Sequence, residues 1–314
     1  LELEREIYHG ELSGRKQAML PLFAALGGML VPAGLFLAFN AGLPTASGAG
    51  IPMATDIAFA LGVLMLLGNR VPTSLKVFLT ALAVFDDLGA ILVIAFFYTT
   101  EISWLYLGLS LGVFVALLIA NRSNFYNLAF YLVGGLLMWF FMLKSGVHAT
   151  ISGVLLAFAI PFRDGGEFSP SYILQQELHK PVAFLILPLF ALANTAIPID
   201  VIGCDLFTQP HSLGITTGLI VGKPLGVILF TLLSVKLGWS HLPTDVSCKG
   251  VVGIGLLAGI GFTISIFITP LTFDDLTLVN EAKLCILVAS LVAGLMGFLL
   301  LNASLRRRRR IHIQ

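Results

Sequence analysis

The sequence predicts an all-α membrane protein that crosses the lipid bilayer several times. Of its 314 residues, 57% are hydrophobic and only 11% are charged, and the mean hydropathy is +0.97. Soluble domains carry about a quarter charged residues, so that class of protein is excluded. Only helices and closed barrels pair all their backbone groups in lipid. The apolar runs lack the alternation of barrel strands, and we therefore expect about ten transmembrane helices.

Ten apolar runs separated by short polar breaks are long enough for membrane-spanning helices. They cover residues 17–40, 51–68, 73–98, 102–120, 124–143, 145–161, 181–197, 213–235, 250–269 and 282–302. Basic residues are concentrated on the side that holds both termini, including the tail arginines Arg306–Arg310. Cytoplasmic loops are enriched in Lys and Arg, so both termini are expected in the cytoplasm. The arginine run is expected to contact anionic lipid headgroups.

Two adjacent acids, Asp86 and Asp87, lie in the middle of the third run. At helical rise, Asp86 is about 20 Å from the start of that run, inside a hydrocarbon layer about 30 Å thick. Acids at this depth face a protein-lined or wet cavity and commonly serve ion or proton movement. The alternative is a structural ion pair or a hydrogen-bonded acid. Lys223 lies near the middle of its own run and is the natural charge partner of the aspartates.

The second and ninth runs are expected to be broken helices. In the second, Pro52 and the pair Thr55–Asp56 interrupt the apolar residues, and the ninth is rich in glycine before Thr263 and Ser265. The glycines fit close helix packing equally well. Position favours the break, because each run is the middle member of a group of three.

Paired broken helices in two three-helix groups indicate an inverted-repeat secondary transporter, whose site lies where the breaks meet. Half-helix ends carry partial charges, positive at N-termini and negative at C-termini. Asp56 and Lys223 have the signs that neutralise them.

Six motifs carry a resemblance to a known family: IPMATDIAFALGVLMLLG, SLKVFLTALAVFDDLGAILVIAFFY, SGVHATISGVLLAF, FLILPLFALANTAI, GLIVGKPLGV and GIGFTISIFI. They resemble the bacterial sodium/proton antiporter A family over essentially the whole chain. The resemblance implies a transporter, not an enzyme, that needs no cofactor and exchanges cytoplasmic Na⁺ or Li⁺ for external H⁺ by alternating access. It also implies electrogenic, pH-regulated exchange in the bacterial inner membrane, serving sodium and pH homeostasis, and a homodimer.

The resemblance implies a division of the chain as well. The expected parts are a cytoplasmic segment 1–16, a first repeat 17–98, interface helices 102–197, a second, inverted repeat 213–302 and a basic cytoplasmic tail 303–314. The family has twelve spans, so its first two helices are expected to be absent from this chain.

Matching motifs imply the roles of single residues. Asp87 would be the main cation-binding carboxylate, and Asp86 its partner, bound to Lys223 when the site is empty. Two neighbouring carboxylates in a desolvated cavity do not both ionise easily, so H⁺ and Na⁺ compete for them, and the buried Lys223 ammonium is itself a candidate proton carrier. Asp56, beside Thr55, would compensate the helix dipoles.

Four further residues are expected to contribute to the pH response: His148, Glu2, Arg5 and Glu6. A histidine that simply bonds a nearby Ser or Thr, and a solvated chain end, are the alternatives.

Three other functions stay open. An intramembrane aspartyl protease also buries two aspartates, but on two facing helices. A passive cation channel would need neither the broken-helix repeat nor the buried Lys223. An inactive fragment of an antiporter is the third.

Overall fold

The structure, a computed structural model, describes residues 15–97, 102–162, 169–197, 206–243 and 245–311. The described residues are helical or irregular, and no strand occurs among them. The chain divides into two compact units. One contains Ile91–Leu189, and the other combines Glu11–Ala90 with Phe190–Gln314.

The unit with Ile91–Leu189 is helical and has a small core of its own. Its helices are α5 (Trp104–Arg122), α6 (Leu128–Lys144), α7 (Thr150–Ala159) and α8 (Pro170–Pro181), followed by a π-helical segment η3 (Val182–Ile186). The α5, α6 and α7 helices pack on one another. Their shared core centres on the buried side chains of Tyr131, Leu117 and Ile160.

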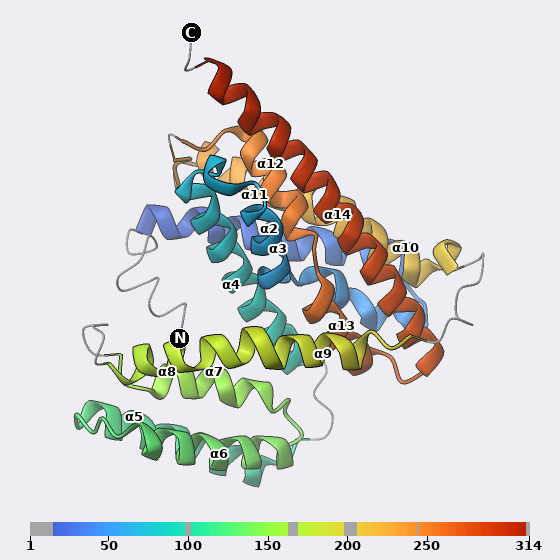
Figure 1. Ribbon diagram of the computed structural model, residues 1–314. Coiled ribbons are helices and arrows are strands. Elements are labelled where there is room, and N and C mark those ends of the chain that lie inside the picture. Colours follow the sequence, from blue (N-terminus) through green and yellow to red (C-terminus); the bar gives the residue numbers. More distant parts are fainter. Residues whose placement is uncertain (1–14, 98–101, 163–168, 198–205, 244, 312–314) are drawn as a thin grey trace. The chain divides into compact units, whose positions relative to one another are not determined.

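The other unit contains the remaining helices of the described chain. In chain order they are α2 (Arg15–Asn40), η1 (Pro44–Met53), α3 (Ile57–Met65), η2 (Gly68–Arg70), α4 (Thr73–Phe97), α9 (Leu187–Asn194), η5 (Leu206–Thr208), α10 (Pro210–Thr217), η6 (Gly218–Gly222), α11 (Lys223–Lys236), α12 (Cys248–Ala258), α13 (Phe262–Thr272) and α14 (Leu276–Ile311). Two of these helices, α4 and α9, contain residues of both units, because the division along the chain falls after Ala90 and after Leu189. The α14 helix runs along both α12 and α13 (Figure 1).

Each of the ten predicted runs falls on a helix or on successive helices. Within the described residues, five helices are long and apolar enough to cross a membrane, or up to seven if each bent pair is one span. The α6 and α7 helices are apolar but shorter, with 17 and 10 residues. The prediction of a multi-pass helical membrane protein is confirmed.

The two runs expected to be broken are bent. The η1 and α3 helices meet at 41°, and α12 and α13 meet at 44°. In the first pair, Ala54 and Asp56 have extended backbone, so the break is made of non-helical residues next to Pro52. In the second pair, the helix stops at Ala258 and restarts at Phe262.

Glycines in α12 and directly after it serve close packing as well as the break. A Cβ at Gly255 would lie 3.1 Å from the Cα of Pro224, and a Cβ at Gly259 would overlap the carbonyl oxygen of Leu219. Both neighbours are backbone atoms of the η6–α11 stretch. The glycine-rich run therefore contains both a helix break and a close packing contact.

A π-helical segment leads directly into Lys223. The η6 segment ends at Gly222, and Pro224 follows Lys223. Proline has no N–H and its ring crowds the preceding turn, so the helix cannot keep its regular hydrogen bonds there. The wider π turn accommodates this defect, and such turns are frequent at functional sites.

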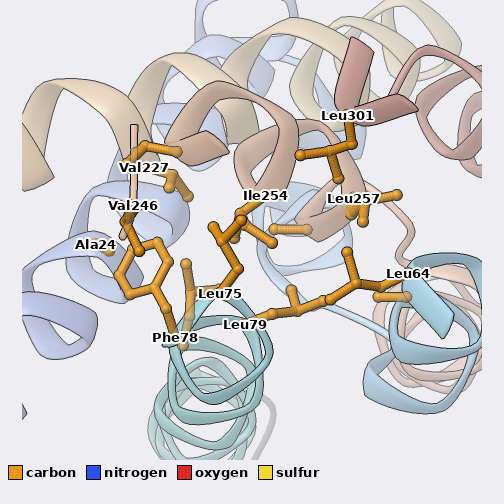
Figure 2. Packing of buried hydrophobic residues seen from close by; sticks show 14 of the residues in the cluster. Ala24, Leu64, Leu75, Phe78, Leu79, Val227, Val246, Ile254, Leu257 and Leu301 are labelled. Carbon is orange, nitrogen blue, oxygen red and sulfur yellow. The ribbon is translucent and has the colours of Figure 1, made fainter. Parts of the chain in front are cut away.

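The apolar core of this unit gathers side chains from helices that are far apart in the sequence. Figure 2 shows Leu75 and Leu79 of α4 against Ile254 and Leu257 of α12, with Val227 of α11 close by. All five are buried. This packing holds α4 and α11, which carry the candidate site residues, against the broken helix α12.

The approach of α2 to α11 generates a prediction. A Cβ at Gly226 would overlap the carbonyl of Gly27, whereas one at Gly34 on α2 would meet nothing within 4 Å. Overpacking against backbone costs about 1–3 kcal/mol. We expect Gly226→Ala to lower the melting temperature of the detergent-purified protein, and Gly34→Ala to leave it nearly unchanged. Equal melting curves for the two variants would contradict the close approach.

Candidate functional site

A fully buried ion pair joins α11 to α4, in the unit that combines Glu11–Ala90 with Phe190–Gln314. The Nζ atom of Lys223 is 2.7 Å from Oδ2 of Asp86, and neither side chain is exposed. Lys223 Nζ also donates a hydrogen bond to the carbonyl oxygen of Met53, at the end of η1. The ammonium is therefore shared between a carboxylate of α4 and the C-terminal end of a half-helix.

The oxygen of Asp86 that contacts Lys223, Oδ2, also contacts the hydroxyl of Thr55. The Thr55 hydroxyl lies 2.7 Å from Asp86 Oδ2 and 2.9 Å from the carbonyl oxygen of Ala258, the last residue of α12. A hydroxyl has one hydrogen to donate, so it cannot fully serve both acceptors. A protonated Asp86 would remove the conflict, because the carboxyl could donate to Thr55 while Thr55 donates to Ala258. The protonation of Asp86 is thus linked to the end of α12.

The second oxygen of Asp86, Oδ1, has a different environment. Oδ1 is buried and accepts no hydrogen bond from the described part of the chain. An unpaired carboxylate oxygen in a buried site is unfavourable. It is therefore a position at which a proton or a cation would be stabilised.

Asp56 binds the N-termini of two half-helices at once. Its Oδ1 accepts from the Phe59 N–H at 3.1 Å and caps α3. Its Oδ2 accepts from the N–H and the hydroxyl of Thr263, at 3.0 and 2.6 Å, in the first turn of α13. A carboxylate at an N-terminus bonds free N–H groups and opposes the positive end of the helix dipole. Asp56 does both for two helices while only 2% exposed.

The opposite, carbonyl ends of the half-helices are also paired. Ile51 O accepts from the Ser265 hydroxyl at 2.7 Å, Met53 O from Lys223, and Ala258 O from Thr55. A backbone hydrogen bond of 2.6 Å joins Asp56 N to Ile260 O and ties the two breaks together. Both broken helices therefore meet at one point, beside the Asp86–Lys223 pair.

Asp87 lies on another side of α4 from Asp86, because neighbouring helical residues are about 100° apart. Its side chain is half-buried, with the Oδ1 atom buried. It is near enough to Lys223 to act on its charge electrostatically. The two carboxylates therefore differ in surroundings: Asp86 is enclosed, and Asp87 is the more accessible.

The remaining predicted residues belong to other parts of the chain. His148 belongs to the unit with Ile91–Leu189. Its Nδ1 is 2.8 Å from the hydroxyl of Thr150, the first residue of α7. Glu2, Arg5 and Glu6 lie outside the described residues, and so do the side chains of Arg306–Arg310. Their proposed roles in pH response and lipid contact stay predictions.

The sequence predicted the charged members of the cluster and the pairing of Asp86 with Lys223, but not the contacts with backbone groups. Thr263 and Ser265 were visible only as polar residues after a glycine-rich run, and the structure bonds them to Asp56 and to Ile51 O. The carbonyl acceptors have no sequence signal at all, because every residue has a carbonyl. A hydroxyl directly after a helix break is the one clue that pointed to such a contact.

Known proteins are similar to this chain over nearly its whole length. The family described as Na+/H+ antiporter 1 matches residues 1–301. The chain is 61% identical over 306 residues to the Na(+)/H(+) antiporter NhaA of Flavobacterium psychrophilum, which covers 98% of the chain and 80% of that protein. Similar proteins with the same name from Cytophaga hutchinsonii and Dechloromonas aromatica are 56% and 58% identical, covering 98% and 96% of the chain and 79% of each relative.

The buried ion pair generates a prediction on stability. Removing one partner of a buried pair leaves the other charge uncompensated and costs about 3–5 kcal/mol. We expect Lys223→Met to lower the melting temperature strongly, and the double variant Lys223→Met with Asp86→Asn to recover much of that loss.

Lys236→Met is the matched control, because Lys236 is exposed on the same helix. It should melt like the parent chain. If the double variant melts as low as Lys223→Met alone, the ion pair does not account for the destabilisation.

Proposed function

Because the chain belongs to the Na⁺/H⁺ antiporter 1 family, we propose that it is a secondary transporter that exchanges Na⁺ for H⁺ at the Asp86–Asp87 pair. The observation that supports this most is the position of Asp86. It is fully buried, bonded through one oxygen to Lys223 and Thr55, and adjacent to the meeting point of two broken helices. The expected substrates are Na⁺, Li⁺ and H⁺.

Competition at one site explains how exchange is coupled. Two neighbouring carboxylates in a desolvated cavity do not both ionise easily, so protons bind well there. Sodium is a hard cation, and hard cations prefer oxygen ligands such as carboxylates. Asp87, the more accessible of the two, is proposed as the main ligand, with Asp86 as its partner. A site that holds either the cation or protons exchanges one for the other.

Lys223 supplies the positive charge that compensates Asp86 in the empty site. With no cation bound, its ammonium compensates Asp86 and retains its contact with Met53 O. When Na⁺ binds, the cation takes over part of this compensation, and Lys223 is free to release a proton. Loss of more protons than cations gained would make the exchange electrogenic, as the family resemblance implies.

The half-helices provide a route to alternating access. Their ends meet through Asp56, Thr55 and backbone groups rather than through continuous helical hydrogen bonds. A change of charge at Asp86 alters the Thr55 hydrogen bond to Ala258. We propose that this change permits the site to open to the opposite side of the membrane, and that only loaded states reorient.

The proposed location follows from sequence and family. A multi-pass bacterial membrane protein with basic residues concentrated on one side is proposed for the inner membrane, with both termini in the cytoplasm. Lipid is the expected environment of the exposed apolar side chains, and a homodimer is proposed from the family resemblance. A pH response through His148 is proposed because histidine can titrate near neutral pH.

Transport in everted membrane vesicles tests this function. Vesicles from a strain without its own sodium/proton antiporters are energised to acidify the interior, and a dye reports ΔpH when Na⁺ or Li⁺ is added. We expect the parent chain to dissipate ΔpH, and Asp87→Asn to reduce the response to background because the cation loses its charged ligand. Asp274→Asn, at an exposed position, should behave like the parent.

The same vesicles separate an antiporter from a channel. An antiporter moves Na⁺ uphill when ΔpH drives it, whereas a passive channel carries cation current without a pH gradient. If the correctly inserted parent chain leaves ΔpH unchanged when Na⁺ or Li⁺ is added, the proposed exchange is wrong. A cation current that does not depend on ΔpH would also overturn it.

A further inference from the structure

The C-terminal end of η1 receives two side-chain hydrogen bonds, one of which has no role in the exchange described above. The last carbonyls of a helix have no partner within it. Met53 O is bonded by Lys223, and Ile51 O is bonded by the Ser265 hydroxyl at 2.7 Å. Ile51 is not exposed and Met53 is only 8% exposed, so water does not readily replace either donor.

Ser265 is held in place for this contact. It lies in the first turn of α13, its backbone N–H donates to Gly261 O at 2.8 Å, and its side chain is not exposed. A Cβ at Gly261 would overlap the Ser265 hydroxyl, so the glycine leaves the space that this oxygen occupies. Thr263, two residues earlier, bonds Asp56. One turn of α13 therefore binds both sides of the break in the η1–α3 pair.

The contact bears on Lys223 because Ile51 and Met53 belong to the same end of η1. Lys223 divides its ammonium between Met53 O and Asp86 Oδ2. If the end of η1 shifts away, Met53 O no longer retains its share, and Lys223 pairs more closely with Asp86. A cation would then have to displace a stronger pair.

We propose that Ser265 is a positioning residue of the exchange site: by holding Ile51 O, it keeps Met53 O directed at Lys223 and so limits how tightly Lys223 closes on Asp86. This inference rests on the proposed Na⁺/H⁺ exchange. Ser265 itself does not contact the cation, and it acts through η1 and Lys223.

The test compares two hydroxyl deletions on the same helix. Ser265→Ala removes the bond to Ile51. Thr269→Val removes an equally buried hydroxyl that donates, at 2.8 Å, to Ser265 O within α13. Ser265→Thr keeps the donor and serves as the rescue variant. Half-saturating Na⁺ and the pH profile of exchange are measured in everted vesicles for all three and for the parent.

For Ser265→Ala we expect half-saturating Na⁺ to rise between about twofold and about tenfold, the range that the loss of one neutral hydrogen bond corresponds to. The pH profile should shift to alkaline values, where Lys223 releases its proton more readily. Thr269→Val should match the parent, and Ser265→Thr should restore most of the affinity. If Ser265→Ala matches the parent, or if both deletions change affinity alike, the positioning role is wrong.

A second measurement does not depend on transport. Hydrogen–deuterium exchange of the purified protein should be faster in peptides covering η1 for Ser265→Ala than for Thr269→Val. Equal exchange would overturn the inference even if the parent transports Na⁺. If η1 exchanges faster in Ser265→Ala but the parent chain moves no Na⁺, the proposed function fails, and Ser265 is reduced to a structural hydrogen bond.

Discussion

The constraint on which this structure depends is the pairing of backbone groups at the ends of broken helices. A helix that stops inside a protein leaves free N–H groups at one end and free carbonyls at the other, and in a membrane-spanning region no bulk water satisfies them. Here the two breaks face each other, and several of the free groups are bonded by side chains from the opposite break. Asp56 takes the N–H groups, while Thr55 and Ser265 serve carbonyls.

The same arrangement explains why charges are tolerated at this depth. An isolated buried charge is very unfavourable, but charges that pair with each other and with helix ends are stabilised. Lys223 meets both conditions, since it contacts Asp86 and a helix carbonyl. The helix end and the carboxylate therefore share one ammonium, which has three N–H groups to donate. Any event that changes the charge of Asp86, such as proton or cation binding, also changes the force on the end of η1.

Close backbone packing is what brings these groups within reach. The contact of Gly255 with Pro224 places α12 against the start of α11, next to Lys223. On the other side, a Cβ at Gly28 of α2 would lie 3.2 Å from Cγ2 of Val227, which follows Lys223 by one helical turn. Larger residues would hold the helices apart and move the ammonium away from Asp86. The glycines thus contribute to the packing around Lys223.

The sequence by itself determined the class of fold, the two broken runs and the charged members of the site, because each leaves a signal along the chain: hydropathy, helix-breaking residues, and charges where charges are rare. It also indicated a family, through motifs around Asp56, Asp86 and Lys223. Only the tertiary structure decided which atoms meet. That Asp56 bonds two helices, that Thr55 faces two acceptors and that Ser265 reaches Ile51 O depend on backbone carbonyls and N–H groups brought together from distant parts of the chain. Such groups are common to all residues, so no residue type marks them, and only folding selects which of them lie within bonding distance.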